Sequence, residues 1–266
     1  MSDSPDPVVT YESYLQVDAL LSLQQPRSDG PEHDEMLFIV VHQVYELWFK
    51  EMLHELDFLT VALGRGDTPR AQHTLKRVLT ILKVLVHQID ILETMTPLEF
   101  LSFRERLESG SGFQSAQFRE LEFALGHKRR ESLNRYEPGT TARARLEHRL
   151  AAPTLWDAFL HYLVQRGQTV PREALTRDVT QSVTSMPSLH PILLEVYRKD
   201  STARELCERL VDLDEGFMEW RYRHVKMVER TIGTRRGTGG SAGAPYLKTT
   251  LDHPLFPDLW EIRTEL

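Results

Sequence analysis

The chain has 266 residues, of which 41% are hydrophobic, and a formal net charge of −7 at pH 7. That length and composition suffice for a sizeable buried core, while the negative charge argues against nucleic acid or an anionic membrane as the main partner. The single cysteine, Cys207, excludes an internal disulfide, and neither a signal-peptide pattern nor a membrane-spanning apolar run is present, so we expect a cytoplasmic protein.

Apolar residues recur every three or four positions from His33 to about Leu63, which predicts a long helix. Glycines in the segment 64–67 end it. Thr68 followed by Pro69 predicts the start of a second helix, with threonine as the cap and proline at the first helical position. This second helix carries an apolar stripe of its own.

A third helix is predicted from Pro97 to about Leu107, because Thr96 and Glu99 have the spacing of a capping box. A fourth helix follows it. A last, long helix covers roughly 202–232 and stops at a glycine.

Residues 127–200 are interrupted by prolines and glycines, and within them only 155–164 has a clear helical pattern. No strand-like alternation and no internal repeat stands out. The sequence therefore predicts an all-α protein, a single domain over residues 1–266 built of long packed helices. Within it we expect an N-terminal segment at 1–31 and a small helical insertion at 127–200.

Two histidines lie on aromatic helical stripes near opposite ends of the chain. His42 shares a helix face with Phe38 and Tyr45, and His224 follows Trp220 by four residues. For each, a core histidine with a hydrogen-bond partner is the plain alternative. No zinc-binding spacing accompanies them, whereas a lone histidine in apolar aromatic surroundings is typical of an axial haem ligand.

Arg104 follows Phe100 by one helical turn, and its guanidinium is the side chain best suited to clamp a carboxylate. A solvated or salt-bridged arginine is the alternative. The glycine-rich segment 237–241 offers backbone N–H groups and hydroxyls for the charged ends of an amino acid. It lacks the full spacing of a phosphate-binding loop, and a flexible linker remains its alternative. Together these features suggest a cofactor pocket that accepts an amino acid.

Short blocks spread over most of the chain match a known family in order and spacing. They are Tyr11–Leu15, His33–Glu35, Leu37–Ile39, His42–Gln43, Tyr45–Trp48, Leu92–Thr96, Phe103–Arg104, Ser111–Ser115, Trp220–Arg221, Arg223–His224, Gly237–Ser241 and Phe256–Leu259. In these blocks the chain resembles the tryptophan 2,3-dioxygenases, and the resemblance is weakest over 127–200. It implies an all-α enzyme with haem b that uses O2 to cleave the indole C2–C3 bond of L-tryptophan. The product would be N-formylkynurenine, in the first step of tryptophan catabolism through the kynurenine pathway.

The resemblance also implies roles for individual residues. His224 would be the axial ligand of the haem iron, and His42 the catalytic histidine that bonds the indole N–H. Arg104 and Thr238 would contact the carboxylate and ammonium groups of the substrate. The other residues implied in the site are Phe38 and Phe100 beside the substrate, Ser111 and Gly112 in the loop on the oxygen side of the haem, and Tyr11, Tyr14 and Leu15, which complete a neighbouring subunit's pocket within a homotetramer.

Two features depart from the commoner family pattern. Phe100 stands where some bacterial members carry a tyrosine, so one hydrogen bond to the substrate carboxylate is absent. The stretch 241–245 replaces a commoner Ser-Ser-Gly form, and Pro245 within it bears on the flexibility of a loop beside the substrate. Two alternatives therefore stay open. One is a haem monooxygenase that converts a tryptophan derivative to a 2-oxindole, and the other is a catalytically silent sensor of haem or tryptophan.

Overall fold

The computed structural model of the chain describes residues 8–30, 32–238 and 243–266, and in these ranges every regular element is a helix. The prediction of an all-α fold is thereby confirmed. The α-helices are α1 (Tyr11–Leu15), α2 (Val17–Leu21), α3 (His33–Gly64), α4 (Thr68–Leu92), α5 (Pro97–Phe103), α6 (Ala116–Ala124), α7 (Thr141–Ala151), α8 (Leu155–Gln165), α9 (Arg172–Leu175), α10 (His190–Lys199), α11 (Ser201–Ile232), α12 (Ala244–Lys248) and α13 (Pro257–Glu261). The 3₁₀ helices are η1 (Arg104–Leu107), η2 (Gly112–Gln114), η3 (Arg130–Arg135), η4 (Pro187–Leu189) and η5 (Ile262–Glu265). In the part of the chain so described, no helix is both long and apolar enough to cross a membrane.

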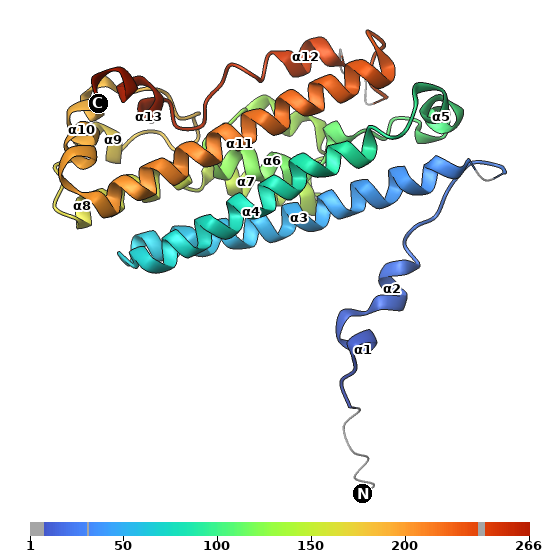
Figure 1. Cartoon of the computed structure of the whole chain (residues 1–266), viewed down its shortest axis with the longest axis horizontal. Coiled ribbons are helices and arrows are strands. Elements are labelled where there is room, and N and C mark those ends of the chain that lie inside the picture. The colour runs from blue at the N-terminus through green and yellow to red at the C-terminus, as the bar shows by residue number, and fades with distance from the viewer. Residues whose placement is uncertain (1–7, 31, 239–242) are drawn as a thin grey trace, which may run out of the picture.

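Three long helices, α3, α4 and α11, run side by side along the longest axis of the molecule (Figure 1). Helix α4 packs against both of the others because its buried residues recur at three- and four-residue spacing along one broad face. The approach of α11 to α4 is close at Gly216, where a Cβ would lie only 2.7 Å from a methyl carbon of Leu82. These contacts form the centre of the hydrophobic core.

The shorter helices cover the long ones. Helices α6 and α8 pack on α3, α7 packs on α6, and α10 packs on α11. At one end of the bundle lie α8, α9, α10 and α13, and towards the other end lie α5 and α12 (Figure 1). Helix α8, inside the region 127–200, buries Trp156, Phe159 and Tyr162 in the main core. The division of that region as an insertion stays a prediction.

Most predicted helix boundaries agree with the structure to within two residues, but the cap of α4 and the end of α5 differ from the prediction. Thr68 is the first helical residue of α4 and is not its cap. Instead the side chain of Asp67 accepts a hydrogen bond from the backbone N–H of Arg70, while the Thr68 hydroxyl lies 2.7 Å from the buried hydroxyl of Tyr162. Helix α5 ends at Phe103, short of the predicted end, and the chain continues as η1.

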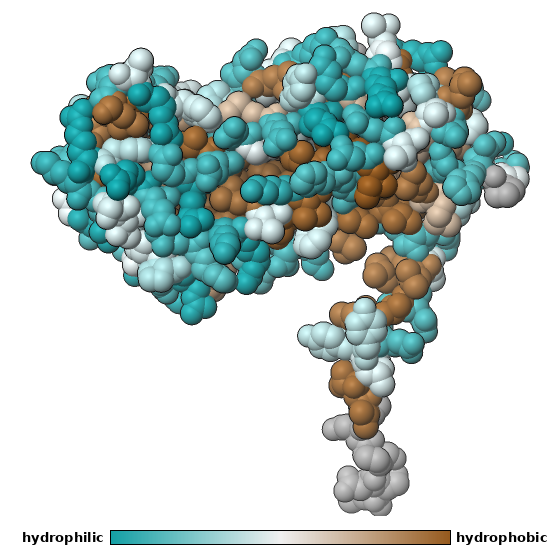
Figure 2. Space-filling model, viewed as in Figure 1, coloured by the Kyte–Doolittle hydropathy of each residue, from teal (hydrophilic) through white to brown (hydrophobic). Residues whose placement is uncertain are grey.

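The N-terminal segment extends away from the helical body as an arm that contains α1 and α2 (Figure 1). It is tied down at its base, where the Gln43 amide donates to the carbonyl of Leu23 and the Glu35 carboxylate accepts from the backbone N–H groups of Arg27 and Ser28. Its apolar side chains are exposed (Figure 2). They are those of Val8, Val9, Tyr11, Tyr14, Leu15, Leu20, Leu21 and Leu23.

Candidate active site

One large cavity is lined by residues of α3, α4, α6 and α11 and by residues of the segments around α5 and η2. Its empty volume is about 1670 Å³, which includes open solvent at its mouth. Among the residues predicted for the site, those that line this cavity are Phe38, His42, Phe100, Arg104, Ser111, Gly112, His224 and Thr238.

The two predicted histidines line the cavity from different helices, His42 from α3 and His224 from α11. Burial and, to a smaller extent, the nearby His42 together lower the pKa of His224 to about 4. Burial also lowers the pKa of His42, against smaller opposite effects from the Phe38 carbonyl and Glu46. At neutral pH both imidazoles are therefore uncharged, which is the form that can coordinate a metal or accept a hydrogen bond.

The tautomer of His42 follows from its hydrogen-bond partner. Its Nδ1 lies 2.7 Å from the carbonyl oxygen of Phe38, one turn earlier in α3. A carbonyl can only accept, so Nδ1 carries the proton and Nε2 keeps a lone pair. His42 can thus accept a hydrogen bond from an N–H group of a bound molecule.

The orientation of the His224 ring is set by Trp220, one turn earlier in α11. The two rings are stacked, with centroids 5.1 Å apart and an interplanar angle of 5°. Trp220 is itself held by Tyr45 and Phe118, whose ring centroids lie 6.3 and 4.9 Å from its own. Trp220 was not predicted as a site residue, although its spacing of four from His224 was a usable signal.

The wall next to His42 is aromatic. The ring centroid of Phe38 lies 4.0 Å from that of His42, 5.8 Å from that of Phe100 and 5.6 Å from that of Phe103. Such a cluster offers flat apolar contact to a planar aromatic guest. A guest of this kind would lie within reach of the acceptor nitrogen of His42.

Arg104 and Thr238 connect the loops at the mouth of the cavity. The Arg104 guanidinium donates to the carbonyl of Arg236 at 2.6 Å, and the Thr238 hydroxyl donates to the carbonyl of Gly110 at 2.5 Å. The predicted glycine-rich segment thus reaches the cavity at 237–238. Its residues 239–241, and position 242 of the unusual stretch, lie outside the described residues.

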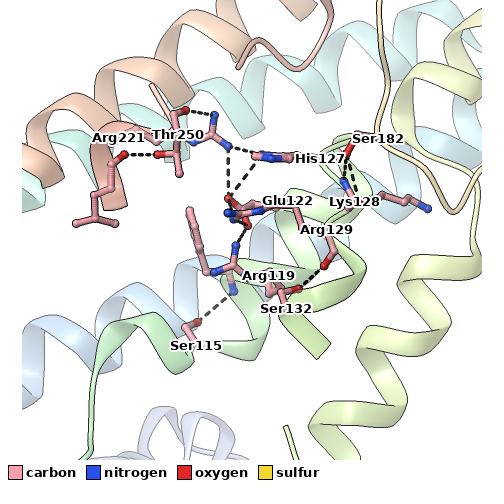
Figure 3. A network of polar contacts seen from close by, with 12 residues as sticks. Ser115, Arg119, Glu122, His127, Lys128, Arg129, Ser132, Ser182, Arg221 and Thr250 are labelled. Carbon is pink, nitrogen blue, oxygen red and sulfur yellow. Dashed lines mark hydrogen bonds and ion pairs between the residues drawn. The ribbon is translucent and has the colours of Figure 1, made fainter. Parts of the chain in front are cut away.

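A group of charged residues that sequence reasoning missed forms another part of the wall: Arg119, Glu122, Arg129 and Arg221. The Glu122 carboxylate accepts from Arg129 at 3.0 Å and from Arg221 at 3.4 Å, and it also pairs with Arg119 (Figure 3). Three guanidinium groups thus surround one carboxylate. We call these four residues the arginine cluster.

The arginine cluster carries a surplus of positive charge. Burial and, to a smaller extent, the charges of Arg129 and Arg221 lower the pKa of the adjacent His127 to about 3, so this histidine adds no charge at neutral pH. Burial likewise lowers the pKa of Arg221, to about 10, at which it remains a cation in neutral solution. A buried surplus of this kind favours an anionic partner. Arg119, Glu122 and Arg129 lie close together in the sequence, but Arg221 is 99 residues beyond Glu122, which explains why no motif revealed the cluster.

The remaining predicted site residues do not reach the cavity of their own chain. Tyr11, Tyr14 and Leu15 lie in the arm, with 76%, 77% and 46% of their surface exposed, respectively. Their proposed place in a neighbouring subunit's pocket stays a prediction.

Comparisons with known proteins extend over nearly the whole chain. The family model for tryptophan 2,3-dioxygenase matches residues 3–154 and 172–266. A tryptophan 2,3-dioxygenase from Herpetosiphon aurantiacus is 59% identical over 258 residues, which span 97% of this chain and 98% of that protein. One from Anaeromyxobacter sp. (strain K) is 56% identical over 260 residues, with 97% and 96% covered, and one from Arthrobacter sp. (strain FB24) is 44% identical over 261 residues, with 97% and 92% covered.

Proposed function

The chain belongs to the tryptophan 2,3-dioxygenase family, and we propose that it is an oxidoreductase that cleaves the indole C2–C3 bond of L-tryptophan with O2 to give N-formylkynurenine. That reaction is the first step of tryptophan breakdown through the kynurenine pathway. The observation that carries the proposal is a single cavity in which the acceptor nitrogen of His42, an aromatic wall and Arg104 meet. These three features match an indole N–H, an indole ring and a carboxylate.

The residues of the cavity fit a haem b group. His224 is half-buried, neutral at pH 7 and held in orientation by Trp220, as suits an axial ligand. The surplus positive charge of the arginine cluster would hold the propionates, and the apolar residues of α4 and α11 would contact the rest of the group. When bound there, haem supplies the redox chemistry with O2 that no side chain of the cavity can perform.

The substrate end of the cavity acts by positioning. The Arg104 guanidinium is already held at the mouth by the carbonyl of Arg236, so it would receive the substrate carboxylate in a preset place. Thr238 would contact the ammonium and carboxylate groups. Phe38, with Phe100 behind it, would lie against the indole ring. Fixing a substrate in this way removes orientational freedom and lowers the barrier to reaction.

His42 would orient the indole by accepting its N–H hydrogen bond at Nε2. Because its Nδ1 proton is engaged by the Phe38 carbonyl, the ring is held both in tautomer and in direction. A hydrogen bond that orients is worth less than the chemistry itself, so the histidine assists the reaction and is not an obligatory base. The arm of a neighbouring chain, with Tyr11, Tyr14 and Leu15, would close the open mouth of the cavity in a homotetramer.

The test is the product formed from L-tryptophan under oxygen-18 gas, with ascorbate as reductant and haem-loaded protein. We expect N-formylkynurenine that carries two labelled oxygen atoms. A product heavier than its substrate by a single oxygen would instead support the 2-oxindole-forming monooxygenase. Haem binding without any turnover would support the silent sensor.

A further inference from the structure

We propose that Arg135 and Tyr136 are positioning residues that clamp the loop Ser111–Ser115 over the cavity. They stand at the end of η3 and just after it, in the region predicted as an insertion, and neither lines the cavity. The role in catalysis rests on the proposed function. The clamp itself rests only on the contacts of the loop.

The first contact is on the ring of Phe113, the central residue of η2. The Arg135 guanidinium carbon lies 3.7 Å from the Phe113 ring centroid, and that of Arg119 lies 5.9 Å from it. Phe113 lines the cavity, as do Ser111 and Gly112 before it. A cation over an aromatic ring within about 6 Å is attracted by the ring quadrupole, so Arg135 holds the loop from outside while its inner side forms the wall.

The second contact is on the backbone of the loop. The Tyr136 hydroxyl lies 3.3 Å from the carbonyl oxygen of Gln114 and 3.2 Å from that of Ser115, to which its single proton can be donated. The side chain of Ser115 caps α6 by accepting from the N–H of Phe118. Tyr136 therefore fixes the point at which the loop enters α6.

The clamp has a firm base. Leu133, two residues before Arg135, is buried in a small cluster with Leu146 and Leu150 of α7. The Arg143 guanidinium donates to the Leu133 carbonyl at 2.5 Å. Helix η3 is thus secured to α7, and the side chains that follow it can act as a fixed support.

The loop needs such support because its other end is poorly anchored. Residues 108–110 are exposed, and Glu108 has φ 51° and ψ −114°, which is unfavourable for a residue with a side chain. At Gly110 the loop is held by the hydroxyl of Thr238. A loop released by Arg135 or Tyr136 would therefore also disturb Thr238, and the first quantity to suffer would be the affinity for substrate.

The first experiment measures amide hydrogen exchange in residues 110–116 of the full-length protein, with Arg135→Ala and Tyr136→Phe as variants. Losing an exposed cation–π contact, as in Arg135→Ala, or a hydroxyl–carbonyl hydrogen bond, as in Tyr136→Phe, shifts an equilibrium by about two- to tenfold, and we expect exchange in this segment to accelerate by a factor in that range. Arg130→Ala, at an exposed arginine of the same 3₁₀ helix, is the matched control and should change nothing. In a Phe113→Leu background, Arg135→Ala should have no further effect.

The second experiment separates positioning from general destabilisation. Arg135→Ala should raise the KM for L-tryptophan with little change in kcat, and Arg135→Lys, which keeps a cation near the ring, should restore part of the affinity. Unchanged exchange in both clamp variants, or an equal change in Arg130→Ala, would overturn the clamp. If the wild type does not turn over tryptophan and the exchange effect persists, the clamp stands and the dioxygenase assignment fails.

Discussion

At the scale of single residues, the cavity depends on keeping two imidazoles neutral while retaining arginine charge close by. Burial accounts for the neutral state of both His42 and His224. The same burial leaves Arg221 a cation, because its ordinary pKa is so high that a shift to about 10 does not discharge it. Neutral imidazoles and a positively charged wall can therefore coexist in one apolar cavity.

The first prediction concerns His224. The variant His224→Ala should lose most of its haem, because no other cavity histidine occupies the α11 side, while its helical content remains that of the wild type. Soret absorbance per chain and far-ultraviolet circular dichroism measure the two properties. His190→Ala, which alters a histidine paired with Asp258 outside the cavity, serves as the control and should bind haem normally. Full haem occupancy with unchanged ligation spectra in His224→Ala would refute the assignment.

The second prediction concerns Arg104. Truncating one partner of a desolvated charge pair costs about 2–5 kcal/mol, so Arg104→Ala should raise the tryptophan requirement at least about thirtyfold and leave haem binding intact. Arg106→Ala is a matched control on the same η1 helix, since Arg106 pairs with Asp29 at the surface. Tryptamine, which lacks the carboxylate, should be a poor substrate of the wild type. Equal turnover of tryptamine and tryptophan would rule out the role.

At the scale of elements, one buried ion pair joins α8 to the segment that follows α9. The Asp157 carboxylate receives two hydrogen bonds from Arg177, at 2.6 and 2.7 Å, and also forms a capping box with Thr154. Burial tends to raise the pKa of Asp157, but the hydrogen bonds from Arg177 and Thr154 more than reverse this and lower it below its ordinary value. The pair therefore depends on an ionised carboxylate.

The third prediction follows from the lowered pKa of Asp157. Since the folded pKa of Asp157 is lowered, its stabilising effect is fully present above the unfolded pKa of about 3.9 and is lost as the pH falls through the folded value. Asp157→Asn should reduce the free energy of unfolding at pH 7 by roughly 3–5 kcal/mol and weaken the acid dependence. Urea unfolding at neutral and acidic pH measures both. Glu147→Gln, at an exposed pair with Arg143, should shift stability by under about 1 kcal/mol; equal effects of the two variants would contradict the argument.

The long helices were predictable because their signals are local. Apolar spacing located α3, α4 and α11, and the capping box of Thr96 and Glu99 fixed the start of α5. The cap of α4 was missed because Asp67 and Thr68 are both good cap residues in sequence. Only the fold places Tyr162 beside the Thr68 hydroxyl and so decides between them.

The site was predictable where a family pattern exists and not where charge is assembled from distant segments. The site residues that were predicted to lie in the cavity of their own chain do line it. Their roles came from the resemblance to the family. The arginine cluster draws on α6, the following loop and α11, and no spacing in the sequence signals that these meet. The clamp of Phe113 by Arg135 is equally non-local.

At the scale of the whole molecule, the arm is the feature that a single chain does not explain. Its apolar side chains are exposed (Figure 2). Helix α3, which follows the arm in the chain, carries further exposed apolar residues, Met36, Val40 and Leu47. Exposed apolar surface of this extent favours a partner surface. The proposed homotetramer, in which arms are exchanged, would bury it.

The fourth prediction tests the arm. Deleting residues 1–20 should strongly reduce activity and loosen the assembly, because the mouth of each cavity would lose Tyr11, Tyr14 and Leu15. Activity assays and light scattering measure the two effects. Glu12→Ala, a polar change on the same short helix, should leave both near the wild-type values. A truncated protein that is fully active would show that the arm plays no part in the site.

The reach of the arm beyond its own body also bears on genetics. If the arm closes the cavity of another chain, a chain that lacks the arm and a chain that carries His224→Ala are each inactive alone. Each of them, however, supplies what the other lacks. The first still has its own axial histidine, and the second still has an arm to lend. Co-expressed in one cell, two such alleles should complement each other and restore tryptophan breakdown, a behaviour that independent subunits would never show.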